Sequence, residues 1–136
     1  MKKILIILLA YSLTVSLDAA AQRRVDVESG ARPELSFRVK EHDFGSVWEK
    51  GRKVSYDYVF TNTGSAPLVI TRTITSCRCV DVEYNKKPVP PGGQGMISVT
   101  YNPRKQQGLF YKAIQIFSNS PEGVQIIIVK GVVRAE

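Results

Sequence analysis

Cysteine and histidine, which supply most metal ligands and many catalytic groups, are scarce in this chain of 136 residues. It contains two cysteines and one histidine. Two thiolates cannot by themselves complete the tetrahedral coordination of a structural zinc ion. The sequence also shows no nucleophile–base pair and no phosphate-binding loop. We therefore predict no catalytic residues, no cofactor and no enzyme activity.

Long helical patterns are missing as well. No stretch repeats apolar residues at sustained spacings of three and four, so we expect no long helix. The chain instead shows short segments that alternate with a period of two, and residues 54–60 are a clear example. Turn residues separate these segments. In Pro90-Pro91-Gly92-Gly93 we expect a type II turn with Gly92 in the left-handed conformation.

The alternating segments predict an all-β domain. Strands are expected at 35–40, 54–60, 68–74, 79–84, 96–101, 109–117 and 124–133, and the inward faces of the last two are ambiguous. About seven strands at this spacing predict an immunoglobulin-like β-sandwich, with a closed barrel as the alternative. The predicted core contains Phe37, Tyr58, Phe60, Ile70, Val99, Ile114 and Ile116.

The N-terminal residues are typical of a secretion signal. Two lysines precede an aliphatic tract, and Ala19-Ala20-Ala21 supplies small residues for cleavage. The tract is short and contains hydroxyl side chains, which favours a cleaved signal over a membrane anchor. We expect a signal peptide at 1–21, a flexible leader at 22–33 and the sandwich at 34–136. The product is then exported to the periplasm, the cell envelope or the exterior, with no transmembrane segment after cleavage.

The net charge is +7, but the basic residues are dispersed along the sequence. Nucleic-acid binding requires a concentrated basic stripe, so we predict no nucleic-acid partner. A solvated surface is the simplest interpretation of these charges. Contact with anionic glycans or lipid headgroups is the alternative.

Both cysteines lie in Ser76-Cys77-Arg78-Cys79. In an extended strand their Cα atoms would be about 6.6 Å apart, so a disulfide would need a local bend. Three interpretations remain open: a structural role as a disulfide or as packed thiols, soft-metal binding such as Cu(I), and thiol–disulfide exchange. We favour the structural role. As further metal ligands, only His42 and Met96 come into consideration.

Two side chains are candidates for binding a partner. Trp48 is the one tryptophan, and it is interpreted either as an exposed aromatic platform or as an anchor at the core edge. Arg78, between the two cysteines, is the second candidate. His42 is expected to be a half-exposed strand or turn residue. Four acidic residues show no spacing that indicates an acid–base pair: Asp43, Asp57, Asp81 and Glu83.

Several short motifs resemble those of a known family. Their order is Glu41-His42-Asp43-Phe44-Gly45-Ser46-Val47, Phe60-Thr61-Asn62-Thr63-Gly64, Pro67-Leu68-Val69-Ile70, the cysteine motif, Pro91-Gly92-Gly93-Gln94-Gly95 and Ile114-Gln115-Ile116-Phe117-Ser118-Asn119. Over about residues 35–133 the chain resembles a secreted Gram-negative bacterial family of immunoglobulin-like domains of unknown function, related to pilus-chaperone-like and sperm-protein-like sandwiches. That family usually has glycine where Arg78 stands here. The resemblance implies a fold and an envelope location, and no activity.

Two hypotheses of function follow. The first is a non-catalytic interaction or structural module whose strand edges and end loops contact another cell-envelope protein. The second is a soft-metal or redox element that uses Cys77 and Cys79. The sequence names neither the partner nor the oligomeric state.

Overall fold

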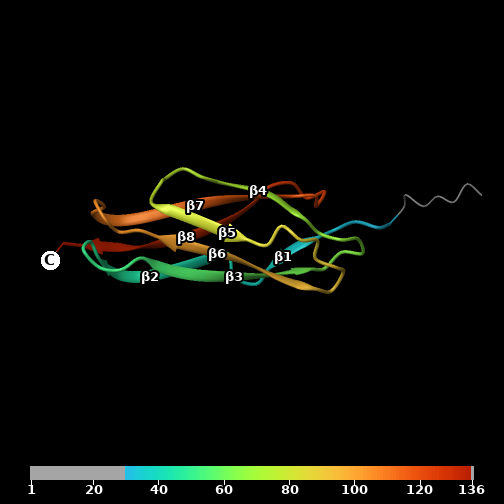
Figure 1. Ribbon diagram of the computed structural model, residues 1–136, viewed down its shortest axis with the longest axis horizontal. Coiled ribbons are helices and arrows are strands. Elements are labelled where there is room, and N and C mark those ends of the chain that lie inside the picture. The colour runs from blue at the N-terminus through green and yellow to red at the C-terminus, as the bar shows by residue number, and fades with distance from the viewer. Residues whose placement is uncertain (1–29, 136) are drawn as a thin grey trace, which may run out of the picture. The chain divides into compact units, whose positions relative to one another are not determined.

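Eight strands in two sheets, and no helix, make up the part of the chain that the computed structural model describes, residues 30–135 (Figure 1). The expected signal peptide and residues 22–29 of the leader lie outside it. The strands are β1 (Leu35–Phe37), β2 (Glu41–Trp48), β3 (Val54–Asn62), β4 (Ile70–Thr75), β5 (Val80–Tyr84), β6 (Gln94–Tyr101), β7 (Gly108–Ser118) and β8 (Gln125–Arg134). Within these residues no helix is long and apolar enough to cross a membrane.

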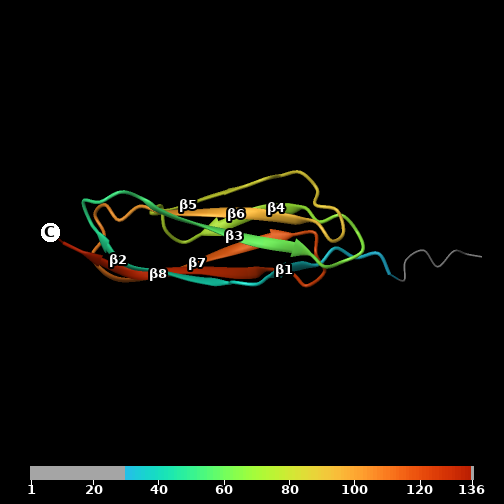
Figure 2. The same cartoon turned by 90° about the horizontal axis from the view of Figure 1, so that it is seen from below.

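The strands form two four-stranded sheets, which Figures 1 and 2 show as facing layers. Their orders are β1-β3-β6-β5 and β2-β8-β7-β4. All pairs are antiparallel except β2 with β8. The predicted all-β, immunoglobulin-like sandwich is therefore confirmed.

The first predicted strand, 35–40, is wrong in extent. The structure ends β1 at Phe37, and the chain then crosses to the other sheet and continues as β2. Val39 lies in this crossing and is 44% exposed, whereas the alternation placed it with Leu35 and Phe37. Alternation with a period of two cannot show that a segment passes from one sheet to the other, because the residues before and after the crossing both alternate.

The core lies between the sheets, and all seven predicted core residues are buried. The aromatic rings fit because two of them face glycines on the next strand. Phe60 pairs with Gly95, and Phe110 pairs with Gly131. A Cβ atom on Gly95 would lie 2.3 Å from the Phe60 ring, and one on Gly131 would lie 2.8 Å from the Phe110 ring. These glycines therefore leave room for the rings.

The turn predicted at 90–93 is confirmed. Gly92 has φ +76°, and the Gly93 amide donates to the Pro90 carbonyl at 2.8 Å. Glycine adopts this left-handed conformation without the steric cost that a Cβ atom would add.

Asn62 connects the loops at this end of the sandwich and is completely buried. Its Nδ2 donates to the carbonyls of Ala66 at 2.7 Å and Val89 at 2.9 Å. Its Oδ1 accepts from the amides of Glu34 at 3.2 Å and Gly64 at 3.0 Å. One side chain thus satisfies four backbone groups in three segments.

Two buried tyrosines differ in how their hydroxyls are satisfied. The Tyr58 hydroxyl reaches the other sheet and donates to the Ile128 carbonyl. The Tyr101 hydroxyl is buried and has no hydrogen-bond partner among the described residues, although its ring stacks on Phe110. Burial raises the pKa of both phenols, and for Tyr58 the neighbouring Tyr56 and Glu41 add to this effect.

We expect Tyr58→Phe to lower the free energy of unfolding by about 1 kcal/mol, because it removes the hydrogen bond from the hydroxyl to the Ile128 carbonyl of the other sheet. Tyr101→Phe should leave that free energy unchanged or raise it, because it removes an unpaired buried hydroxyl. Denaturant unfolding at neutral pH measures both. A larger loss for Tyr101→Phe than for Tyr58→Phe would contradict the assignment.

The raised pKa values of Tyr58 and Tyr101 predict that the free energy of unfolding falls at alkaline pH. A tyrosine titrates near pH 10 when unfolded, and both phenols have higher pKa values in the fold. Their contribution is therefore complete below about pH 10 and is lost as the pH rises through the folded pKa values. Unfolding midpoints measured from neutral pH upward should fall above about pH 10, and less steeply in Tyr58→Phe. An unaltered slope in that variant would disprove the link.

Candidate functional site

The two cysteines lie on the connection that crosses from β4 in one sheet to β5 in the other. Their sulfur atoms are at disulfide-bonding distance, and the Cα atoms are 5.1 Å apart. The chain bends here as a disulfide requires: the Val80 amide donates to the Cys77 carbonyl at 3.3 Å. The Asn102 amide donates to the Cys79 carbonyl at 2.8 Å, which attaches the bend to the β6–β7 loop.

The surroundings of this pair fit a packed structural element. Cys79 is only 8% exposed and belongs to the core, and Cys77 packs against the core from its edge. The other proposed metal ligands lie elsewhere. Met96 is exposed on the outer face of β6, and His42 is in β2 of the other sheet, with its ring stacked on Tyr56 at 3.8 Å between centroids. The described residues contain no group of three or more His, Cys, Asp or Glu side chains that could hold a metal ion.

Removing the disulfide should cost little stability. The ring spans only two residues, so it restrains the unfolded chain weakly, and its stabilisation should lie at the low end of the range of about 0–5 kcal/mol for disulfides. We expect Cys77→Ser combined with Cys79→Ser to fold with a modest loss in a denaturant melt. We also expect thiol titration of the native wild type to find no free thiol. Two reactive thiols with bound copper would contradict the structural role.

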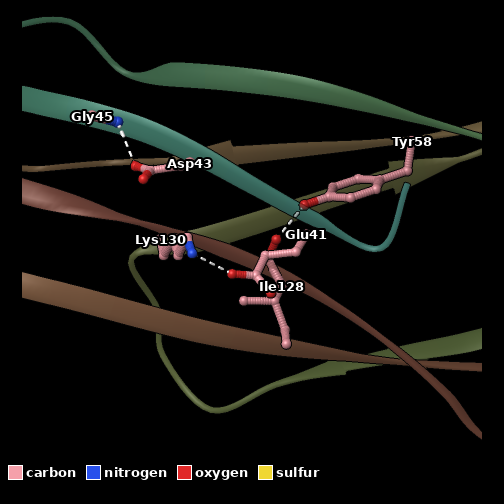
Figure 3. Close-up of polar contacts among 6 residues, drawn as sticks. All are labelled: Glu41, Asp43, Gly45, Tyr58, Ile128 and Lys130. Carbon is pink, nitrogen blue, oxygen red and sulfur yellow. Dashed lines mark hydrogen bonds and ion pairs between the residues drawn. The ribbon is translucent and has the colours of Figure 1, made fainter. Parts of the chain in front are cut away.

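His42 and Asp43 belong to an irregular stretch of β2. The register between β2 and β8 shifts between Asp43 and Ser46, and Gly45 has φ +68° at this bulge. The Asp43 carboxylate accepts a hydrogen bond from the Gly45 amide at 2.7 Å (Figure 3). His42 is half-buried, as predicted. The His-Asp-Phe-Gly motif therefore builds a bulge in β2.

Lys130 and Glu41 form an ion pair beside the bulge, with 2.5 Å between Nζ and Oε1 (Figure 3). The hydrogen bond that the Lys130 ammonium donates to the Glu41 carboxylate raises the pKa of Lys130. Both side chains are about 40% exposed, so the pair contributes little stability. Lys130 lies on the outer face of the β2-β8-β7-β4 sheet, where most of the other outward side chains are apolar.

The outer face of this sheet is unusually apolar, and we call it the apolar face. The side chains that carry it are Ile74, Leu109, Tyr111, Phe117, Ile126, Ile128 and Val132. Four of them exceed 40% exposure, and Leu109 reaches 85%. A shallow hollow of about 430 Å³ lies on this face, lined by Leu109, Tyr111, Lys130, Val132 and neighbours on β2. Contiguous exposed apolar surface of this kind marks interaction sites.

The outer face of the opposite sheet is mostly polar, although Val59 and Met96 pair in register there and are 48% and 49% exposed. Ser55 and Thr100 hydrogen-bond to each other at 2.8 Å, and Ser98 donates to Asp57 at 2.6 Å. Glu83 pairs in register with Ser98 from the other side. These acids thus lie on a hydrated strand face. The two outer faces therefore differ in degree: the β2-β8-β7-β4 sheet exposes more apolar side chains than the β1-β3-β6-β5 sheet.

The structure places the two binding candidates on different segments. Trp48 ends β2 and is 51% exposed, so the interpretation of this residue as a core-edge anchor is wrong. Arg78 is exposed on the cysteine bend. Sequence reasoning missed the apolar face itself. The signal was the ambiguity of the strands at 109–117 and 124–133: their faces could not be separated because both are apolar.

The family comparison supports the same fold. A family model described as a protein of unknown function, DUF1573, matches residues 35–133. The chain belongs to this family. No curated protein matches it. The matched range contains all eight strands up to Val133, so family membership covers the whole sandwich.

Solved structures similar to this DUF1573 member share the sandwich at low identity. A protein of unknown function from Porphyromonas gingivalis W83 has TM-score 0.67 and 18% identity, over 76% of this chain and 48% of that one. The PapD-like domain 7 of human CEP192 has TM-score 0.60 and 9% identity, over 77% and 88%. The secreted serine protease VesC from Vibrio cholerae has TM-score 0.55 and 19% identity, over 80% and 24%.

These matches show the fold alone. The chain spans about half the length of the Porphyromonas protein and about a quarter of VesC.

Proposed function

We propose that this DUF1573 member is a non-catalytic, exported module of the cell envelope that binds another envelope protein through its apolar face. The observation that carries this proposal is the exposure of Leu109, Tyr111 and Ile126 on one sheet face. Side chains of this size are enriched in protein interfaces and are buried when a partner covers them. The polar outer face of the other sheet serves as an internal comparison in the same molecule.

Export is supported by the N-terminal sequence, with its two lysines, aliphatic tract and small residues before Gln22. An exported location also suits the disulfide between Cys77 and Cys79, because disulfides persist in oxidising compartments. N-terminal sequencing of the protein from an envelope fraction should begin at or near Gln22. An intact Met1 in that fraction would contradict cleavage.

The alternative function, a soft-metal or redox site at Cys77 and Cys79, has less support. A disulfide has no thiolate to offer a metal, and Cys79 is buried in the core. Arg78, a cation that could activate a thiol, lies between the two bonded cysteines. No specific geometry favours this function over the structural role.

Site-specific photo-crosslinking in the producing bacterium tests the interaction. A photoreactive residue at Tyr111 should give a discrete adduct with an envelope protein, whereas one at Ser98 on the polar face should not. The adduct from Tyr111 should disappear when Ile126→Lys is added, because a charge on the same face disrupts an apolar contact. It should persist when Thr100→Lys is added on the opposite face. Equal adducts from both faces, or none from Tyr111, would refute the proposal.

A further inference from the structure

One end of the sandwich is strongly basic, and we call it the basic end. It consists of the β2–β3 turn, the β6–β7 loop and the C-terminal end of β8. Its exposed cations are Lys50, Arg52, Lys53, Arg104, Lys105 and Arg134. Within residues 49–53, 102–107 and 134–135, Glu49 is the only carboxylate side chain. The fold thus gathers at one end six basic residues that are dispersed along the sequence.

The fold brings these segments together although some 50 residues separate the turn from the loop. The Glu49 amide donates to the Arg134 carbonyl at 2.9 Å. Glu49 and Lys50 line one surface hollow together with Arg104 and Lys105. Figures 1 and 2 both show the turn, the loop and the end of β8 at the same end of the sheets.

Exposed apolar side chains adjoin the cations. Trp48 precedes the turn, pairs in register with Arg134 and is 51% exposed. Leu109 is the second residue of β7, just after the loop, and is 85% exposed. Tryptophan beside cations is typical of the boundary between lipid headgroups and acyl chains.

The loop also holds a lysine in an unusual conformation. Lys105 has φ +61°, and it is the one residue other than glycine in the described chain with a positive φ. A side chain with a Cβ atom is disfavoured in this left-handed region, where glycine would be comfortable. The exposed Lys105 thus adds a cation to the basic end in a conformation that glycine would adopt at less cost.

The opposite end of the sandwich lacks this bias. Its exposed charges include Lys86 and Lys87 on the β5–β6 connection, but also Glu34 and Glu122. The positive charge of the described domain is therefore concentrated at the end that also carries Trp48 and Leu109.

We propose that the basic end is a peripheral docking site for an anionic phospholipid bilayer. The cations attract the headgroups, and Trp48 and Leu109 enter the interfacial region beneath them. A soluble anionic polymer would satisfy the charges but would leave both apolar side chains in water, so the bilayer fits the observations better. Leu109 also belongs to the apolar face, so the bilayer and the protein partner compete for this one side chain, whereas Trp48 and the six cations lie outside the apolar face as defined above.

The chain carries its own probe, because Trp48 is its only tryptophan. Phosphatidylcholine vesicles containing an equal part of phosphatidylglycerol should shift Trp48 emission to the blue, and vesicles of phosphatidylcholine alone should not. Raising the salt from about 0.1 M to about 1 M should weaken the partitioning, since it screens exposed charges. No emission shift with the anionic vesicles, or a shift that high salt leaves unchanged, would overturn the proposal.

A pair of double variants with equal charge change tests the location. Lys50→Gln with Lys105→Gly should lower the partition coefficient about 25-fold, because each basic residue near an anionic surface contributes about fivefold. Glycine also suits the φ of Lys105, so this variant should stay folded. Lys86→Gln with Lys87→Gln at the other end should change partitioning by less than about twofold.

Two further outcomes would refute the bilayer site. Equal losses in the two double variants would mean that net charge alone drives the attraction. Binding to a soluble polyphosphate without binding to the anionic vesicles would mean that the end recognises a polymer.

Discussion

Replacing Asn62 with alanine is expected to lower the free energy of unfolding by about 3–5 kcal/mol. The side chain is fully buried, and its amide satisfies four backbone groups from three segments. Alanine removes the partner of the Ala66 carbonyl and of the Glu34 and Gly64 amides, whereas the Val89 carbonyl still accepts from the Leu68 amide at 2.9 Å. Each buried polar group left unpaired costs about 1–3 kcal/mol, and partial access of water reduces the sum.

Asn119, which directly follows β7, provides a matched control. Its side chain also bridges backbone groups, accepting from the Val69 amide at 2.9 Å and donating to the Pro67 carbonyl at 3.0 Å, but it is exposed. Water can replace these bonds, so Asn119→Ala should cost less than about 1 kcal/mol. Denaturant melts of both variants make the comparison.

An aspartate at position 62 tests whether the shape of the side chain or its hydrogen-bond donor stabilises the fold. Asn62→Asp keeps the shape and the acceptor but loses the donor, and it places a carboxylate against two carbonyls. We expect it to be at least as destabilising as alanine. Similar small losses for Asn62→Ala and Asn119→Ala would show that the buried amide does not hold this end of the sandwich.

Phe60→Ala is expected to cost about 3–5 kcal/mol, the second large effect. The ring is 2% exposed, and it lies over Gly95 and against the Phe37 ring at 6.0 Å between centroids. Truncation leaves a cavity between the sheets that the glycine cannot fill. Phe117→Ala is the control: this ring lies on the outer face beneath the Arg72 guanidinium at 4.1 Å, and its loss should cost about 1 kcal/mol.

Because the Phe60 ring lies against Gly95, we expect the effects of substitutions at these two positions on stability to be non-additive. Gly95→Ala in the wild type drives a Cβ atom into the ring and should be strongly destabilising. In the Phe60→Ala background the same change meets no ring and should cost much less. A double-mutant cycle by equilibrium unfolding measures the coupling. Additive effects would mean that the ring and the glycine do not compete for the same space.

Local sequence patterns predicted the strands with one polar face well. Residues 54–60 alternate cleanly, and the structure places Tyr58 and Phe60 inside and Asp57 and Val59 outside. β8 was harder, because its outward Ile126 and Val132 are as apolar as its inward Ile127 and Val133. Alternation identifies the buried face only when the other face is polar, and an apolar outer face removes that contrast.

By itself the sequence determined the all-β class, the seven core residues we named, the turn at Gly92 and the family, because these depend on neighbours along the chain. Only the tertiary structure decided which residues far apart in sequence meet. It divided residues 35–48 between two sheets and brought the four backbone partners of Asn62 around its side chain. It also placed Lys50, Arg104 and Arg134 at one end of the sandwich. Such contacts depend on strand order and register, which the periodicity of a single strand does not encode.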